Sequence, residues 1–311
     1  MVSWIELKTS KRTDPFQDPK TDSKSTQDTH PSEGCSQVDT GERTRWDFET
    51  AGSDAAGNRG QLAAYAAALM DSRWRLHTFA LLIYGTHARF MRWDRSAAIV
   101  SAKFNYKKQP EFLADFLWRL NHASEDVLGF DSTIKPFEDA SFRRHFPGYE
   151  GPLYQVIVPS REGSGQGEAY VIPTQDLRRL TSPFGRGTRS TRAVLVRDSD
   201  HVHFLKDYWR VKGDGLKNEG EIYGLLEGAN VPHIAPFVSG NDVDGDHHTT
   251  IGHQYEGKPW ENGDQQDQKG KTTISVYQHY RMTLGVVGKD LTSFRSTREY
   301  TQAIADAMEG L

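Results

Sequence analysis

Residues 184–219 read FGRGTRSTRAVLVRDSDHVHFLKDYWRVKGDGLKNE, and this stretch decides how the C-terminal half folds. It opens with a turn at Gly185–Thr188 and continues as two apolar runs separated by an acidic turn, which is the pattern of a β-hairpin. Lys206 ends the second run. The periodicity then predicts a helix over Leu216–Glu227, and Glu219 lies on its inner face. The pattern predicts a glycine turn, a hairpin with a lysine, and a helix with a glutamate.

This ordered set suits the binding of a nucleotide. Glycines let backbone amides approach phosphates, a strand lysine neutralises them, and a helix glutamate aligns the lysine. Each part also has a plainer interpretation, because a G-x-G turn is usually only a turn and a strand lysine is often a solvated charge. Ser190 replaces a third loop glycine, and the glycines at 220, 224 and 228 weaken the helix.

At these residues the chain resembles the fungal-type protein kinase family, a divergent branch of the protein kinase-like superfamily. The resemblance is carried by GRGTR (185–189), LKDYWR (205–210), EGEI (219–222) with Leu225 and Leu226, HYRMTLGVVGKDLTSF (279–294), RGQLAAY (59–65), ARFMRWDR (88–95) and GFD (129–131).

The resemblance implies a function, cofactors and site residues. The family transfers the γ-phosphoryl group of ATP to protein Ser or Thr hydroxyls with Mg²⁺. It implies that Gly185 and Gly187 belong to the phosphate loop and that Lys206 binds phosphate with Glu219 as partner. Val286 and Val287 would lie against adenine at the hinge. Residues 181–295 would form the small lobe, with a polar insertion at 240–272, and residues 296–311 would begin a large-lobe helix.

The sequence contains no H-R-D and no D-F-G, the motifs that supply the catalytic aspartate and a magnesium ligand. We therefore expect a truncated kinase fragment without phosphoryl transfer and without tight binding of ATP and Mg²⁺. The alternative is a non-catalytic, pseudokinase-like binding module.

The N-terminal half has a pattern of its own, and the whole chain is predicted to be α+β with a division near residues 175–182. Residues 1–8 and 59–175 resemble a restriction-endonuclease-like α/β domain, with residues 9–58 as a disordered loop. Strands within 75–104 should form one antiparallel group, packed by helices near 59–70 and 110–121. Glu6 and Lys8 end a strand, and Gln61 and Tyr65 share a helical face, as in a metal-dependent nuclease.

The nuclease hypothesis is less favoured than the kinase fragment and the pseudokinase-like module. No acidic residue precedes Glu6 to complete a metal site, so edge-strand charges are the competing interpretation. Asp242, Asp244 and Asp246 alternate as in a calcium loop, but His253 stands where the loop needs a glutamate. The neighbouring histidines His247, His248 and His253 lack the second cluster or cysteines of a zinc site.

Composition limits the remaining classes. The 311 residues carry a net charge of −4, which argues against nucleic-acid binding through bulk charge. The single cysteine, Cys35, excludes an intrachain disulfide framework and suits a reducing compartment. No apolar run approaches the roughly 18 residues of a membrane span. We expect an intracellular protein of the cytoplasm or nucleus, with no membrane partner and a protein partner that the sequence does not identify.

Overall fold

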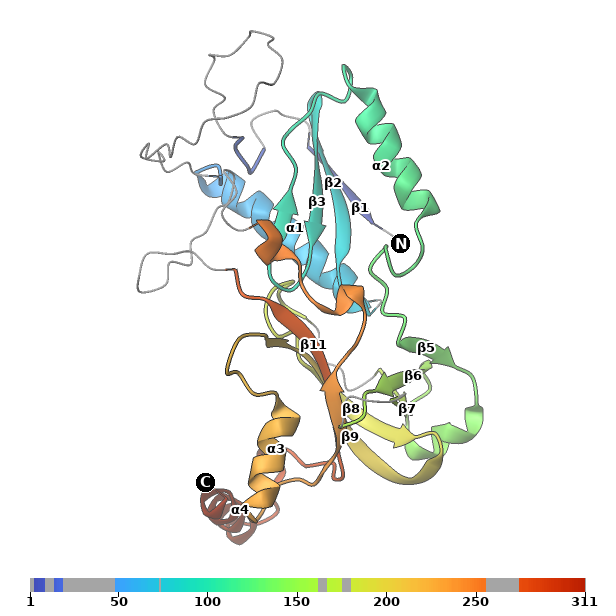
Figure 1. The fold of residues 1–311 in the computed structure, drawn as a ribbon, viewed down its shortest axis with the longest axis vertical. Coiled ribbons are helices and arrows are strands. Elements are labelled where there is room, and N and C mark those ends of the chain that lie inside the picture. Colours follow the sequence, from blue (N-terminus) through green and yellow to red (C-terminus); the bar gives the residue numbers. More distant parts are fainter. Residues whose placement is uncertain are drawn as a thin grey trace, which may run out of the picture.

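The computed structural model describes residues 3–8, 14–18, 48–72, 74–161, 167–174, 180–255 and 274–310. Within these residues the chain forms a four-stranded and a seven-stranded sheet, which follow one another along the long axis of the molecule (Figure 1). Helices accompany both sheets, so the predicted α+β class is confirmed.

The first sheet is mixed and is covered on both faces. Its order is β1 (Trp4–Lys8), β2 (Thr78–Tyr84), β3 (His87–Trp93), β4 (Ala98–Val100), with β1 parallel to β2 and the other pairs antiparallel. Leu62 and Ala66 of α1 (Ser53–Ser72) pack on Leu82, whereas Phe116 of α2 (Pro110–His122) packs on the opposite face near Leu81. The predicted group of three antiparallel strands and two helices is confirmed.

The predicted disordered loop at residues 9–58 needs a correction in its described parts. Helix α1 begins at Ser53, ahead of the predicted start at residue 59. Phe16 is buried, stacks on Phe48 and bridges to Glu49. The fully buried Arg89 explains this order, because its guanidinium binds the carboxylates of Asp14 at 2.8 Å and Asp18 at 2.6 Å. Residues 9–13 and 19–47 lie outside the described residues.

The second sheet is antiparallel throughout and has the order β10-β11-β9-β8-β7-β6-β5. Its strands are β5 (Ile134–Phe137), β6 (Leu153–Val158), β7 (Glu168–Ile172), β8 (Arg189–Leu195), β9 (Asp198–Val211), β10 (Phe237–Asp242) and β11 (Tyr277–Leu284).

This order corrects the predicted division of the chain. The sequence placed residues 59–175 in the N-terminal domain, yet β5, β6 and β7 belong to the second sheet. Tyr170 and Val171 of β7 pair with Leu195 and Val194 of β8. Tyr170 is fully buried in a core that β6, β7, β8 and β9 share. The sheets therefore separate before β5, not at residues 175–182.

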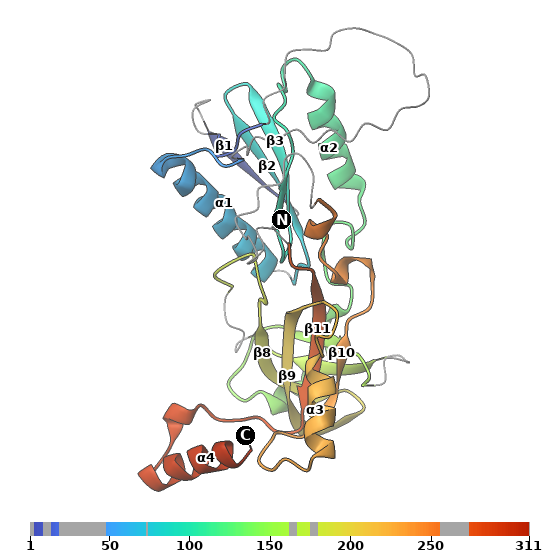
Figure 2. The ribbon, with the colours of Figure 1, turned by 60° about the vertical axis from the view of Figure 1, so that its left-hand side comes forward.

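Two helices accompany the second sheet. Helix α3 (Glu219–Gly228) lies along β9, β10 and β11, and α4 (Thr297–Glu309) lies beyond it at the end of the molecule (Figure 2). Short 3-10 turns occupy Ala140–His145, Asp246–His248, Gly252–Tyr255 and Leu291–Ser293.

The predicted polar insertion at residues 240–272 is partly structured. Its described part, residues 240–255, contains the end of β10 and two 3-10 turns, and it buries Val243, His248 and Thr250. The remainder of the predicted insertion, residues 256–272, lies outside the described residues.

Candidate nucleotide-binding site

The side chains of Lys206 and Glu219 meet in a two-pronged ion pair. Lys206 Nζ, on β9, lies 2.8 Å from Oε1 and 2.7 Å from Oε2 of Glu219, the first residue of α3. Each side chain is about one quarter exposed, at 25% and 24%. The contact predicted from the sequence is therefore present, and both groups remain within reach of a ligand.

Three local features hold Glu219 in place. Asn218 and Glu221 form a capping box that fixes where α3 begins. The Gly220 N–H donates a hydrogen bond of 2.9 Å to the Tyr280 hydroxyl on β11. A Cβ at Gly220 would lie 2.8 Å from that hydroxyl and 3.0 Å from the Phe237 ring, so only glycine lets the helix approach this closely.

Cations gather on this face of the sheet around Tyr208. Lys206 Nζ lies 4.8 Å from the centre of the Tyr208 ring, and the Arg186 guanidinium lies 4.9 Å from it. Burial, with the nearby Glu219 carboxylate, raises the pKa of Tyr208, so its phenol stays neutral. Arg210 is paired with Asp242 at 2.6 Å. Among the described residues Arg186 has no ion pair, and its side chain is exposed.

The glycines of the predicted phosphate loop serve packing in this structure. Gly185 and Gly187 have φ of +84° and +50°, a region that favours glycine. A Cβ at Gly187 would lie 2.6 Å from the Arg95 guanidinium carbon. The turn is tied by hydrogen bonds of 2.8 Å from Gly185 N–H to the Arg95 carbonyl and from Trp209 N–H to the Arg186 carbonyl. The two glycines thus allow the turn to pack closely against Arg95, which follows the last residue of β3 in the first sheet.

The predicted adenine contacts lie after the end of β11. Val286 and Val287 are 48% and 39% exposed, and the preceding Gly285 N–H donates to the Pro236 carbonyl. Met282 of the same strand is the register partner of Lys206. The structure thus joins Lys206 to Glu219, brings Arg186 near them, and leaves the two valines available at the surface.

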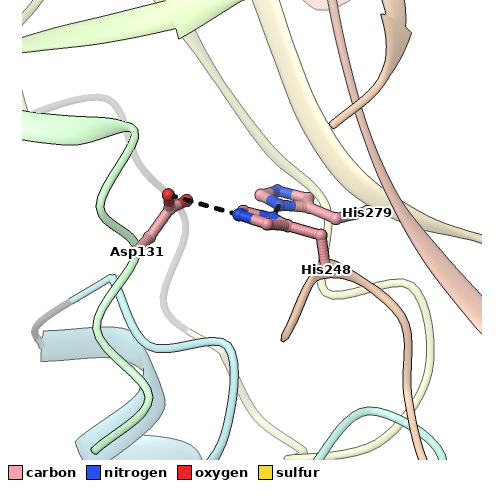
Figure 3. A group of neighbouring side chains, drawn as sticks. All are labelled: Asp131, His248 and His279. Atoms are coloured by element: carbon pink, nitrogen blue, oxygen red, sulfur yellow. Dashed lines mark hydrogen bonds and ion pairs between the residues drawn. The ribbon is translucent and has the colours of Figure 1, made fainter. Parts of the chain in front are cut away.

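A second polar cluster is buried on the opposite face of β9 (Figure 3). Arg281 is fully buried and binds Asp207 at 2.7 Å and Asp131 at 3.0 Å. His279 Nε2 lies 3.0 Å from Asp207, and the Nδ1 atoms of His279 and His248 lie 2.8 Å apart. His248 Nε2 faces Asp131 at 3.9 Å (Figure 3).

Asp131, His248 and His279 offer ligand atoms within 4.8 Å of one another, which is a possible metal site. Their bonds argue against it. Arg281 already holds Asp131, the Nδ1 atoms of His248 and His279 share one hydrogen bond of 2.8 Å, and His279 Nε2 bonds to Asp207, so these nitrogens are already engaged. Burial and His279 lower the pKa of His248 to about 3, which keeps it neutral. We interpret the cluster as structural.

Sequence reasoning missed this cluster. It named the Gly129–Asp131 and His279–Phe294 motifs but assigned no role to Asp131, His279 or Arg281. Asp131 and Arg281 are 150 positions apart, so no local spacing signals their contact.

The nuclease-like residues of the first sheet also come together. Lys8 Nζ lies 2.9 Å from Glu6 and 2.7 Å from the Gln61 side-chain oxygen, and Gln61 donates to the Tyr65 hydroxyl at 2.7 Å. This network shows that the four side chains share one site, but it adds no second carboxylate. The restriction-endonuclease-like fold stays a prediction.

In the nucleotide-binding lobe of protein kinases, a glycine-rich turn leads into a hairpin, a strand carries a lysine, and a glutamate of the next helix holds that lysine. The same arrangement is present here. The family model described as fungal protein kinase matches residues 23–311, so the chain belongs to that family. No curated protein and no solved structure matches the chain. Within the described residues, no helix has the length and apolar character needed to cross a bilayer.

Proposed function

We propose that these 311 residues bind ATP through the small lobe of a protein kinase and do not themselves transfer the phosphoryl group. The observation that carries the proposal is the two-pronged contact between Lys206 and Glu219. In protein kinases this pair must be formed before the phosphates can be positioned.

The charges on this face support the binding of phosphate. Glu219 holds the Lys206 ammonium, and Arg186 adds an exposed cation beside the same tyrosine ring. Lys206 would donate to the α- and β-phosphates while Glu219 keeps its side chain extended. Arg186 would meet the outer phosphates, and the exposed Val286 and Val287 would offer apolar contact to adenine.

The transfer step needs further groups. Family membership implies Mg²⁺, which would neutralise charge on the β- and γ-phosphates, and an aspartate that accepts the proton of the attacking Ser or Thr hydroxyl. Neither H-R-D nor D-F-G occurs among these residues. We therefore assign binding and orientation of the nucleotide to them, and we propose that they act as a pseudokinase-like module when separated from such motifs.

A titration with a fluorescent ATP analogue tests this proposal. Lys206→Met should weaken binding by about tenfold or more, which corresponds to loss of a charge-assisted contact worth roughly 1.5–3 kcal/mol. Lys135→Met is the matched control, because Lys135 is an exposed strand lysine on β5, at the far edge of the same sheet. Equal affinity in wild type and Lys206→Met would refute the assignment, as would ATP-dependent phosphorylation of a protein substrate that Lys206→Met abolishes.

A second candidate function, cleavage of a phosphodiester, is favoured by the network of Glu6, Lys8, Gln61 and Tyr65. Glu6 would bind Mg²⁺ and Lys8 would polarise the attacking water. Nicking of supercoiled plasmid in Mg²⁺ that is lost in Glu6→Gln would support this function. Plasmid that stays intact with the wild-type chain would dismiss it.

A further inference from the structure

Helix α3 is held by an arginine that comes from a distant strand of the second sheet. Arg161 follows β6, and its Nη2 lies 2.7 Å from Oε2 of Glu227 in the last turn of α3. The same guanidinium lies 5.1 Å from the centre of the Phe237 ring on β10, and that ring packs against Tyr223 of α3. Arg161 thus contacts both the helix and a strand on which the helix packs.

Arg161 can reach α3 because the second sheet curls. Strands β6 and β10 are separated by four others in the sheet order, yet the Ser239 hydroxyl of β10 donates to the Pro159 carbonyl at 2.8 Å. Arg281 of β11 also donates to the Ile157 carbonyl of β6 at 2.6 Å. These bonds fix the end of β6 beside β10. Only the Arg161 side chain then has to be ordered when it binds α3, which lowers the entropic cost of the contact.

Gly224 provides the space for this contact. A Cβ at Gly224 would lie 3.2 Å from Arg161 Nη2, which is shorter than an ordinary van der Waals contact, so a larger residue would push against the guanidinium. Gly220, four residues earlier on the same face of the helix, similarly admits the Tyr280 hydroxyl. The two glycines lower the helix propensity of α3, but they let it be held from two sides, by β11 and by Arg161.

We propose that Arg161 is a positioning residue of the nucleotide site, which keeps Glu219 in contact with Lys206 by holding the other end of α3. Gly220 and Glu227 are seven residues apart, so they lie on one face of the helix, near its two ends. Rolling of the helix about its axis, or tilting about the Gly220 end, would carry Glu219 away from Lys206. The contact at Glu227 opposes both movements.

An isolated ion pair at the surface would not have this effect. The Arg161 and Glu227 side chains are 42% and 41% exposed, and such a pair alone contributes little to stability. The Phe237 ring adds a cation–π contact, and the bonds at the end of β6 keep the guanidinium in place. The effect on ATP rests on the proposed function, whereas the effect on the contact between Lys206 and Glu219 does not.

Variants of the 311-residue chain test the proposal. Arg161→Gln should speed the modification of Lys206 by an amine-reactive reagent, and it should weaken binding of the fluorescent ATP analogue by about threefold to tenfold. Arg161→Glu should act in the same direction, and adding Glu227→Arg should restore both properties, because the ion pair re-forms with its charges exchanged. Arg119→Gln is the matched control and should change neither, since Arg119 is an exposed arginine of α2 that pairs with Asp115 at the same distance of 2.7 Å.

Urea unfolding of the same variants separates positioning from a purely structural role. A lower urea midpoint in Arg161→Gln with Lys206 modified at the wild-type rate would overturn the proposal. So would a charge-exchanged chain whose Lys206 is as reactive as in Arg161→Glu. If the wild-type chain does not bind the ATP analogue but Arg161→Gln still speeds the modification of Lys206, the proposed function fails while the positioning role of Arg161 is supported.

Discussion

Gly220→Ala should disturb the contact that positions Glu219, although alanine is the better helix former. The new Cβ would lie 2.8 Å from the Tyr280 hydroxyl and 3.0 Å from the Phe237 ring. Tyr280 is fully buried and Phe237 is 8% exposed, so neither ring has room to withdraw. The first turn of α3 would have to move away from β11 and lose the hydrogen bond from Gly220 N–H to Tyr280.

The magnitude follows from two opposing terms. Overpacking costs roughly 1–3 kcal/mol, and the lost hydrogen bond about 1 kcal/mol. The gain in helix propensity from glycine to alanine is at most about 1 kcal/mol. We expect net destabilisation of about 1–3 kcal/mol. Gly228→Ala is the matched control in the same helix, since its Cβ would meet nothing within 4 Å, and it should be neutral or stabilising by up to about 1 kcal/mol.

Urea unfolding measures the free energy of unfolding of each variant. The rate at which an amine-reactive reagent modifies Lys206 reports whether Glu219 still holds its ammonium group. Gly220→Ala should lower the midpoint and speed the modification, whereas Gly228→Ala should do neither. If the two variants were equally stable and equally protected, the reasoning that close approach at Gly220 positions Glu219 would be refuted.

Three further predictions concern other charged groups. Arg281→Met should destabilise the chain by about 3–5 kcal/mol, because it leaves Asp131 and Asp207 buried without their cation; a loss below 1 kcal/mol in urea would contradict this. The pKa of His248 falls from 6.5 to about 3 on folding, so its contribution to stability is complete above pH 6.5 and is lost progressively as the pH falls toward 3. The urea midpoint should therefore fall with acid over that window, and less steeply in His248→Asn. Arg186→Gln should weaken binding of the ATP analogue by up to about tenfold without changing the urea midpoint, since its guanidinium is exposed; binding of adenosine should not change.

Local pattern was sufficient for part of the fold. A few consecutive residues were enough to predict each of three elements. These are the hairpin that carries Lys206, the helix that carries Glu219 and the strands within residues 75–104. The contact between Lys206 and Glu219 was expected from the resemblance to the kinase family, in which a strand lysine pairs with a glutamate of the next helix.

Long-range pairing was not predictable in the same way. The local sequence of β5, β6 and β7 indicates strands, but it does not show which sheet they join. Their place in the second sheet follows from the pairing of β7 with β8. The order in the segment around Asp14 depends on Arg89, 75 positions away. In a sequence, a buried arginine cannot be distinguished from a surface arginine. The cost of removing its charge from water is offset by partners that lie far away along the chain.

Lys206 and Asp207 are adjacent in β9 but face opposite sides of the sheet. The first is held by α3, and the second by Arg281, which also holds Asp131 at the joint between the two sheets. One peptide unit therefore separates the ammonium proposed to bind phosphate from the residue that anchors the joint. A rotation of the first sheet that pulled on Asp131 would be transmitted through Arg281 and Asp207 to the Lys206 backbone, so β9 provides one mechanical connection between the first sheet and the proposed phosphate-binding lysine.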